Sequence, residues 1–145
     1  MNLPMLSAAA AALVLAACAP VRHTVAAADG SPVAVVEASH GSTFDADGTT
    51  HLTVGDRLTV RIEGNPTTGY VWADDYPGTN ILRQTGVAAY QASTAPGIVG
   101  AGGVYLFSFK AVAPGTVPVK LIYYRPWERN TPPVKTFTFT AVVAP

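Results

Sequence analysis

The sequence has one cysteine, Cys18, and charged residues make up only 12% of it. A single cysteine excludes an internal disulfide and a metal site built from several thiolates. The three histidines, at positions 23, 40 and 51, lack the spacing of metal ligands, so we expect neither a metal nor a cofactor. Lys and Arg number nine, as do Asp and Glu, and the basic residues form no cluster, which argues against a nucleic-acid partner.

Helical periodicity is also missing, because after residue 33 no segment repeats its apolar residues every three to four positions. The chain instead alternates short apolar stretches with turns rich in Gly, Pro and Asp. The strongest of these stretches are 33–37, 57–63, 104–112, 117–124 and 135–143. This pattern predicts an all-β fold, an immunoglobulin-like antiparallel β-sandwich of about seven to eight strands without disulfides. The Cys…Trp…Cys spacing of antibody domains is absent, so the likeness concerns architecture alone.

Alternation within these strands predicts which side chains fill the core. Leu58, Val60 and Ile62 share one face of their strand. Phe137 and Phe139 are expected to point inward, with the threonines on either side of them pointing outward.

The first seven residues carry no Lys or Arg, yet the stretch that follows has the character of an export signal. Residues 8–17 are apolar but too short to span a membrane comfortably. They lead into Leu15-Ala16-Ala17-Cys18, which resembles the lipobox of bacterial lipoproteins, where the cysteine is lipidated after cleavage. An ordinary secreted protein, cut after a small residue, is the alternative.

The chain is therefore divided into three parts. We interpret 1–17 as a lipoprotein-type signal peptide, 18–32 as lipidated Cys18 with a flexible tether, and 33–145 as one folded domain. The expected location is the cell envelope, with a lipid on Cys18 anchored in a bacterial membrane, at the outer membrane or the periplasmic face. Without lipidation the protein would be secreted.

One loop between two predicted strands has an unusual composition, the hexapeptide Asn-Pro-Thr-Thr-Gly-Tyr at 65–70. Pro66 has a fixed φ and disfavours helical backbone at Asn65. Thr67 and Thr68 are β-branched and stiff, and Gly69 can adopt a positive φ. We expect a rigid, uncharged finger suited to filling a cleft rather than to catalysis. An ordinary strand-connecting loop is the other interpretation.

Two further loops are unusual. Segment 94–103 ends in Gly-Ala-Gly-Gly, and because a strand follows it without a Lys-Ser/Thr pair, a phosphate site is poorly supported. Its glycines would let the backbone lie flat against a partner. Segment 125–130 begins with Arg-Pro-Trp, and an exposed Trp beside Arg is typical of an interface anchor. Trp127 could instead fold back onto the edge of the sandwich.

These three motifs, in this order and each between strands, resemble those of the chagasin-like inhibitors of papain-family cysteine peptidases. The resemblance covers the chain from about residue 33 to its end. It implies reversible, tight-binding inhibition, with three loops at one end of the sandwich blocking the active-site cleft. Thr67 and Thr68 would lie near the catalytic Cys and His of the enzyme. Trp127 would pack on an aromatic surface of the primed side, and 100–103 would follow the other flank of the cleft.

The peptidase-binding residues implied by the resemblance fall into three groups, one for each loop. They are Asn65, Pro66, Thr67, Thr68, Gly69, Tyr70, Gly100, Ala101, Gly102, Gly103, Arg125, Pro126 and Trp127. The residues themselves agree with an inhibitor, because no His lies in any of these loops to activate a nucleophile, so we expect no enzyme.

The partners expected are a papain-like cysteine peptidase and a membrane reached through the lipid on Cys18, and we expect a monomer. The alternative function is a cell-envelope adhesive or glycan-binding β-sandwich module. In that case Tyr76, Tyr90, Tyr124 and Trp127 would stack on sugars.

Overall fold

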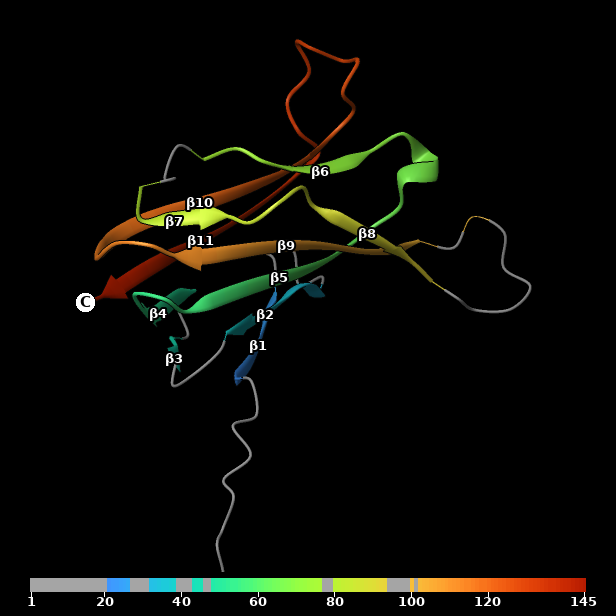
Figure 1. Ribbon diagram of the computed structural model, residues 1–145. Helices are drawn as coiled ribbons and strands as arrows, with labels where there is room; N and C mark the ends of the chain where they lie inside the picture. The colour runs from blue at the N-terminus through green and yellow to red at the C-terminus, as the bar shows by residue number, and fades with distance from the viewer. Residues whose placement is uncertain are drawn as a thin grey trace, which may run out of the picture.

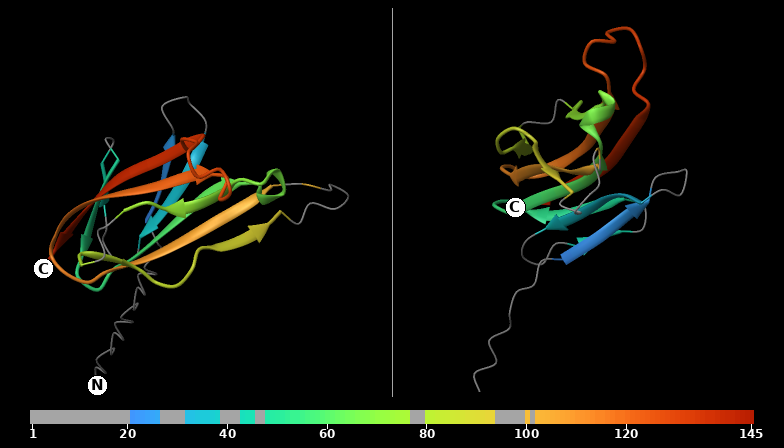
Figure 2. Two further views of the ribbon diagram at one scale, coloured as in Figure 1. Left: turned by 90° about the horizontal axis from the view of Figure 1, so that it is seen from above. Right: turned by 90° about the vertical axis from the view of Figure 1, so that its right-hand side faces the viewer.

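The computed structural model describes residues 21–26, 32–38, 43–45, 48–76, 80–93, 100 and 102–145. Over these residues the chain forms eleven strands and one short 3₁₀ turn, arranged as two sheets (Figure 1). The two sheets lie over each other, as the two turned views show (Figure 2). The all-β sandwich predicted from the sequence is confirmed.

The first sheet has the strand order β1-β2-β5-β9-β7, and β8 also pairs with β9. Its strands are β1 (Val21–Ala26), β2 (Pro32–Ala38), β5 (Arg57–Gly64), β7 (Leu82–Gln84), β8 (Ala89–Ala92) and β9 (Gly103–Ala111). The pairs in this sheet are antiparallel. Strand β8 pairs with the beginning of β9 and β7 with its end, so β9 holds both short strands in place.

The second sheet has the order β3-β4-β11-β10-β6. Its strands are β3 (Thr43–Phe44), β4 (Thr49–Thr53), β6 (Val71–Asp74), β10 (Gly115–Tyr124) and β11 (Lys135–Ala144). Strands β4 and β11 are parallel, whereas the other described pairs are antiparallel. The predicted antiparallel sandwich thus includes one parallel pair, β4 with β11.

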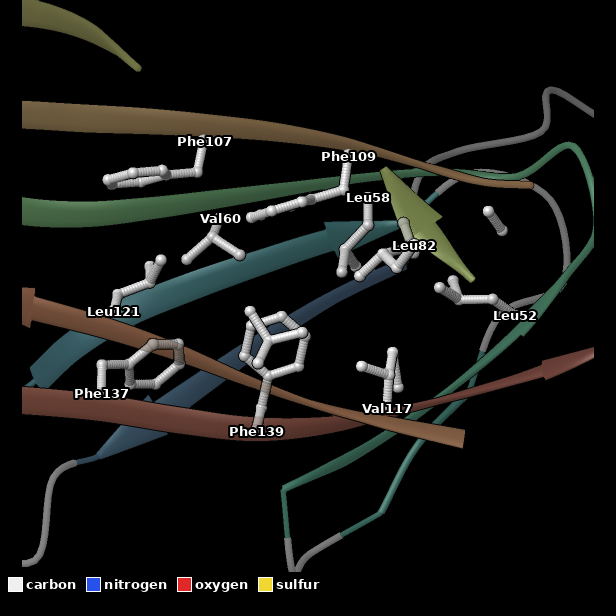
Figure 3. Close-up of a cluster of buried hydrophobic side chains, with 14 of the residues drawn as sticks. Leu52, Leu58, Val60, Leu82, Phe107, Phe109, Val117, Leu121, Phe137 and Phe139 are labelled. Atoms are coloured by element: carbon white, nitrogen blue, oxygen red, sulfur yellow. The ribbon is translucent and has the colours of Figure 1, made fainter. Parts of the chain in front are cut away.

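The core lies between the two sheets and follows the alternation predicted from the sequence (Figure 3). Leu58, Val60 and Ile62 of β5 are fully buried, and Leu58 and Val60 point toward β10 and β11 (Figure 3). Phe137 and Phe139 are buried, while the threonines that alternate with them are exposed or half-buried. Burying each large apolar side chain contributes about 1.5–3 kcal/mol to the stability of the folded state, which explains how the fold forms without a disulfide.

Two features differ from the sequence-based expectation. The structure has more strands than the predicted seven to eight, and the first of them, Val21–Ala26, falls within the predicted tether. This strand pairs antiparallel with β2, from Val21 opposite Ala38 to Ala26 opposite Pro32. The β-branched residues at 21, 24 and 25 favour a strand, but the surrounding alanines obscured the pattern. Cys18 and the predicted signal at 1–17 lie outside the described residues.

The loop at 65–70, the beginning of β9 and the end of β10 lie away from the C-terminus (Figure 1). The loop at 65–70 joins β5 to β6, and the loop at 125–134 joins β10 to β11. Gly100 and Gly102 precede β9, which begins at Gly103. Strand pairing brings these ends together, since Gly64 lies opposite Gly103, and Tyr124 lies opposite Val71.

Candidate functional site

The hexapeptide 65–70, called the finger below, forms a single turn of 3₁₀-helix, η1 (Pro66–Thr68). Asn65 precedes the turn in an extended conformation, with φ −136° and ψ 97°. Gly69 ends it in the left-handed region with φ 85°, and its N–H donates to the Pro66 carbonyl at 2.9 Å. The conformations expected from Pro66 and Gly69 are thus confirmed.

Asn65 organises the finger through both its side chain and its backbone. Its Oδ1 accepts from the Thr67 N–H at 3.1 Å and from the Thr67 hydroxyl at 2.6 Å. Its carbonyl accepts from the Thr68 N–H at 3.2 Å and from the Thr68 hydroxyl at 2.6 Å. Both threonines remain exposed although their hydroxyls are held, so the finger presents a fixed surface to solvent.

A stack of aromatic rings supports the finger from below. The Tyr123 hydroxyl accepts from the Asn65 N–H at 3.0 Å and donates to the Asn65 carbonyl at 3.3 Å. The Tyr123 ring stacks on Tyr70 at 5.3 Å and lies 5.0 Å from the ring of Trp72. Trp72 is buried and donates to the Glu63 carbonyl at 2.9 Å, which fixes this stack to β5. The finger is therefore packed directly against residues that are anchored in the core.

The glycine segment is tied to the finger at Gly100. The Asn65 side-chain amide donates to the Gly100 carbonyl at 2.9 Å, and Gly100 has a positive φ of 79°. Ala101 and residues 94–99 lie outside the described residues, so the expected contact role of Ala101 stays a prediction.

Gly102 and Gly103 have structural reasons to be glycine. A Cβ on Gly102 would lie 3.2 Å from the Gly64 carbonyl oxygen. A Cβ on Gly103 would overlap the Gln91 carbonyl and lie 2.6 Å from the Tyr90 hydroxyl. Gly103 is also paired on both sides, with Gly64 of β5 and Ala92 of β8. The absence of a side chain at Gly103 therefore allows the neighbouring strands to approach closely, independently of any contact with a partner.

The third loop places Trp127 against the finger. Trp127 is 65% exposed, yet a Cβ on Gly69 would lie only 2.5 Å from its Cη2 atom and 2.9 Å from its Cζ2 atom. The indole thus rests on the open face of Gly69, and the alternative in which Trp127 folds onto the sandwich edge does not hold. Pro126 is exposed beside it.

Arg125 anchors the same loop to the finger. Its guanidinium lies over the Tyr70 ring, 4.4 Å from the centroid, and its Nη1 donates to the Glu128 carboxylate at 3.0 Å. The Glu128 N–H donates back to the Arg125 carbonyl at 3.0 Å and closes the turn. The hydrogen bond to Glu128 is the main reason that the pKa of Arg125 is raised above its ordinary value. Arg125, Tyr70, Tyr123 and Trp72 thus form a continuous stack from the surface to the core.

Sequence reasoning missed Tyr123 and Glu128, which hold the site together from outside the three motifs. The alternation of β10 offered a signal for Tyr123, because it shares a face with the buried residues Val117, Val119 and Leu121. The partner of its hydroxyl is 58 positions away in the sequence, and alternation carries no information about such a pairing.

The aromatic residues proposed for sugar stacking are largely used inside the protein. Tyr76 donates to the Leu82 carbonyl at 2.5 Å and packs edge-on against Phe109. Tyr90 packs against Tyr105 with ring centroids 5.0 Å apart. Trp127 is left as the exposed aromatic among the four, which does not favour a glycan-binding platform.

A model of the family described as "Chagasin family peptidase inhibitor I42" matches residues 51–141. This range contains all three loops and more than half of the chain. The chain belongs to the chagasin family of peptidase inhibitors. The resemblance seen in the loop motifs is confirmed. The prediction that the chain is not an enzyme is confirmed as well, since the family consists of inhibitors.

Proteins from Entamoeba histolytica are similar to the chain. Amoebiasin-2 is 32% identical over 96 residues, which cover 66% of this chain and 76% of that protein. Amoebiasin-1 is 35% identical over 77 residues, covering 52% of this chain and 72% of that protein. The crystal structure of the cysteine protease inhibitor EhICP2 is 31% identical, with a TM-score of 0.60 over 66% of this chain and 86% of that chain.

No helix in the described part of the chain is long and apolar enough to cross a membrane. The same residues hold no group of three or more His, Cys, Asp or Glu side chains placed to bind a metal ion.

Proposed function

We propose that this chain is a reversible, tight-binding inhibitor of papain-like cysteine peptidases, which inserts the finger into the active-site cleft. The observation that carries the proposal is the direct contact between the three loops. Asn65 is bonded to Gly100 on one side, and Gly69 carries the Trp127 indole on the other. Segments far apart in the sequence therefore form one surface before any partner binds.

A surface assembled in advance favours tight binding because less freedom is lost on association. Each side chain immobilised only on binding costs about 0.5–1.5 kcal/mol. Both threonine side chains of the finger are already held by Asn65, and Arg125 of the third loop is held by Glu128 and Tyr70. Exposed Trp127 supplies the large aromatic contact that is typical of an interface hot spot.

The shape of the finger also explains how it would enter a cleft without being cut. A peptide must lie extended through the cleft to be hydrolysed as a substrate. Residues 66–68 instead form a helical turn that is closed by the bond from the Gly69 N–H to the Pro66 carbonyl. Strands β5 and β6 hold both ends of the loop.

The test is a titration of papain with the purified full chain, carrying Cys18→Ser so that its lone thiol cannot form a mixed disulfide with the enzyme. We expect stoichiometric loss of peptidase activity, recovery of activity on dilution, and an intact chain after long incubation. Absence of inhibition, or cleavage between Thr67 and Thr68, would contradict the proposal.

We further propose that Cys18 is lipidated and holds the inhibitor at a bacterial membrane of the cell envelope. The support is the sequence Leu15-Ala16-Ala17-Cys18 after an apolar run, together with the fact that this is the sole cysteine. In fractions of a bacterium that expresses the full chain, the wild type should be found with the membranes and Cys18→Ser should not. Equal membrane content for the two, with the signal still processed, would overturn this proposal.

A further inference from the structure

The tip of the finger, residues 66–69, has no hydrogen-bond donor left for a partner. Pro66 has no N–H. The N–H groups of Thr67, Thr68 and Gly69 all donate within the finger. Both threonine hydroxyls donate as well, to the side chain and to the carbonyl of Asn65, each at 2.6 Å.

The same tip is rich in free acceptors. No described residue donates to the carbonyl of Thr67 or to that of Thr68. Each hydroxyl oxygen also keeps lone pairs after its proton is donated. Residues 66–69 include no charged side chain. The tip therefore offers a partner oxygen atoms that accept hydrogen bonds, and nothing that donates them.

The active site of a papain-like peptidase contains groups of both kinds. Its catalytic Cys is a thiolate paired with an imidazolium at neutral pH. The thiolate can only accept hydrogen bonds, so it would repel the oxygens of the tip. The imidazolium and the N–H groups that form the oxyanion hole are donors aimed at an oxygen atom.

We propose that the tip binds through donors that the peptidase supplies, chiefly the imidazolium, and that the inhibitor therefore selects the thiolate–imidazolium form of the enzyme. This inference rests on the proposed function and specifies the chemistry of its target. When the imidazolium loses its proton, one donor disappears and the site gains net negative charge opposite the tip. A hydrogen bond to a charged group contributes enough that its loss weakens binding about tenfold or more.

Few titratable groups of the inhibitor lie near the finger, so they contribute little to the pH dependence of binding. The titratable side chains packed at the base of the finger are Tyr70, Tyr123, Arg125 and Glu128, the last two joined in an ion pair. No histidine lies in any of the three loops. Histidine is the side chain whose ordinary pKa lies between pH 5 and 8, so a change of affinity in that range does not originate in the three loops.

The experiment measures the dissociation constant for papain and the full chain with Cys18→Ser by calorimetry, from pH 6 to pH 9.5. The pKa of the imidazolium is taken from the pH dependence of kcat/KM for a small substrate in the same buffers. We expect the dissociation constant to rise about tenfold as the pH passes this pKa.

Two variants separate this effect from a general loss of affinity. The double variant Thr67→Val, Thr68→Val removes both hydroxyl oxygens with little change in shape, and it should bind more weakly at neutral pH with a flatter pH profile. Trp127→Ala should bind more weakly at every pH and keep the full rise. Melting temperatures confirm that both variants are folded.

The outcomes distinguish the inference from the proposed function. Binding that is unchanged or tighter at high pH would mean that the tip does not depend on the imidazolium, and it would overturn the inference while leaving inhibition intact. A double variant with the full pH dependence of the wild type would support the inference with the Thr67 and Thr68 carbonyls as the acceptors, because the double variant keeps both. Absence of binding at every pH would instead contradict the proposed function.

Discussion

Two glycines of this chain have nearly the same positive φ and very different surroundings. Gly69 ends the finger with φ 85°, and Gly86 lies in the turn between β7 and β8 with φ 86°. A Cβ on Gly86 would meet nothing within 4 Å, whereas a Cβ on Gly69 would lie 2.5 Å from the Trp127 indole. Gly86 is required only for its positive φ. Gly69 is required for its positive φ and also because a side chain there would collide with Trp127 of another loop.

The apolar side chains nearest to these glycines differ in the same way, Val87 next to Gly86 in the chain and Trp127 against Gly69 in space. Val87 is 95% exposed and Trp127 is 65% exposed, so exposure alone would favour Val87 as a contact residue. Trp127, however, rests on the finger, and the finger rests on the aromatic stack of Tyr70, Tyr123 and Trp72. The two residues differ in their packing: Trp127 is connected through the finger to the buried core, and this packing, rather than exposure, distinguishes the end of the molecule that carries the site.

The largest effect on stability is expected at a third glycine, Gly103. Gly103→Ala should lower the free energy of unfolding by about 3 kcal/mol, because the new Cβ would overlap the backbone of β8 and the Tyr90 hydroxyl. Gly100→Ala is the matched control, since it meets nothing within 4 Å and has only the cost of a positive φ, about 1 kcal/mol. Chemical denaturation measures both, and equal losses would mean that β8 moves aside readily.

Trp127→Ala should raise the inhibition constant for papain about thirtyfold, as expected for an exposed aromatic anchor worth about 2 kcal/mol. Val87→Ala is the control and should leave inhibition unchanged, since Val87 lies in the turn between β7 and β8, outside the three loops. Equal inhibition by the two variants would show that Trp127 does not bind the enzyme.

Gly69→Ala and Gly86→Ala test the contrast between the two glycines directly. Both should lose about 1 kcal/mol of stability from strain at a positive φ. Gly69→Ala alone should weaken inhibition, about tenfold, because its Cβ displaces the indole of Trp127. If both variants inhibit equally well, the contact between Gly69 and Trp127 is not part of the working surface.

The smallest expected effect is a change in the pH dependence of stability at Tyr76, which belongs to the sandwich and not to the loops. Burial, followed by the charge of Asp74, raises the pKa of Tyr76 to about 12. The folded state therefore keeps this proton above the ordinary tyrosine pKa of about 10. The resulting stability is fully present below pH 10 and is lost as the pH rises to about 12. Tyr76→Phe should flatten this decline in alkaline denaturation curves, and an unchanged curve would assign it to other groups.

Much of the fold and of the finger could be predicted because the signals are local. Alternation placed Leu58, Val60 and Ile62 in the core, and Pro66 and Gly69 determined the torsions on either side of η1. These features depend on a residue and its immediate neighbours in the sequence.

The connections between the loops could not be predicted in the same way. The bond from Asn65 to Gly100 spans 35 positions and that from Asn65 to Tyr123 spans 58, so both depend on strand register. The parallel pairing of β4 with β11 and the strand Val21–Ala26 likewise depend on which edges meet in three dimensions.

A double-mutant cycle tests most directly whether the finger and the Trp127 loop act as one surface. The inhibition constant for papain is measured for Gly69→Ala, Trp127→Ala and the double variant, each confirmed as folded. If Gly69→Ala acts by displacing Trp127, the double variant should inhibit about as poorly as Trp127→Ala alone, about thirtyfold weaker than the wild type. Losses that multiply to about three-hundredfold would show two independent contacts and contradict the account.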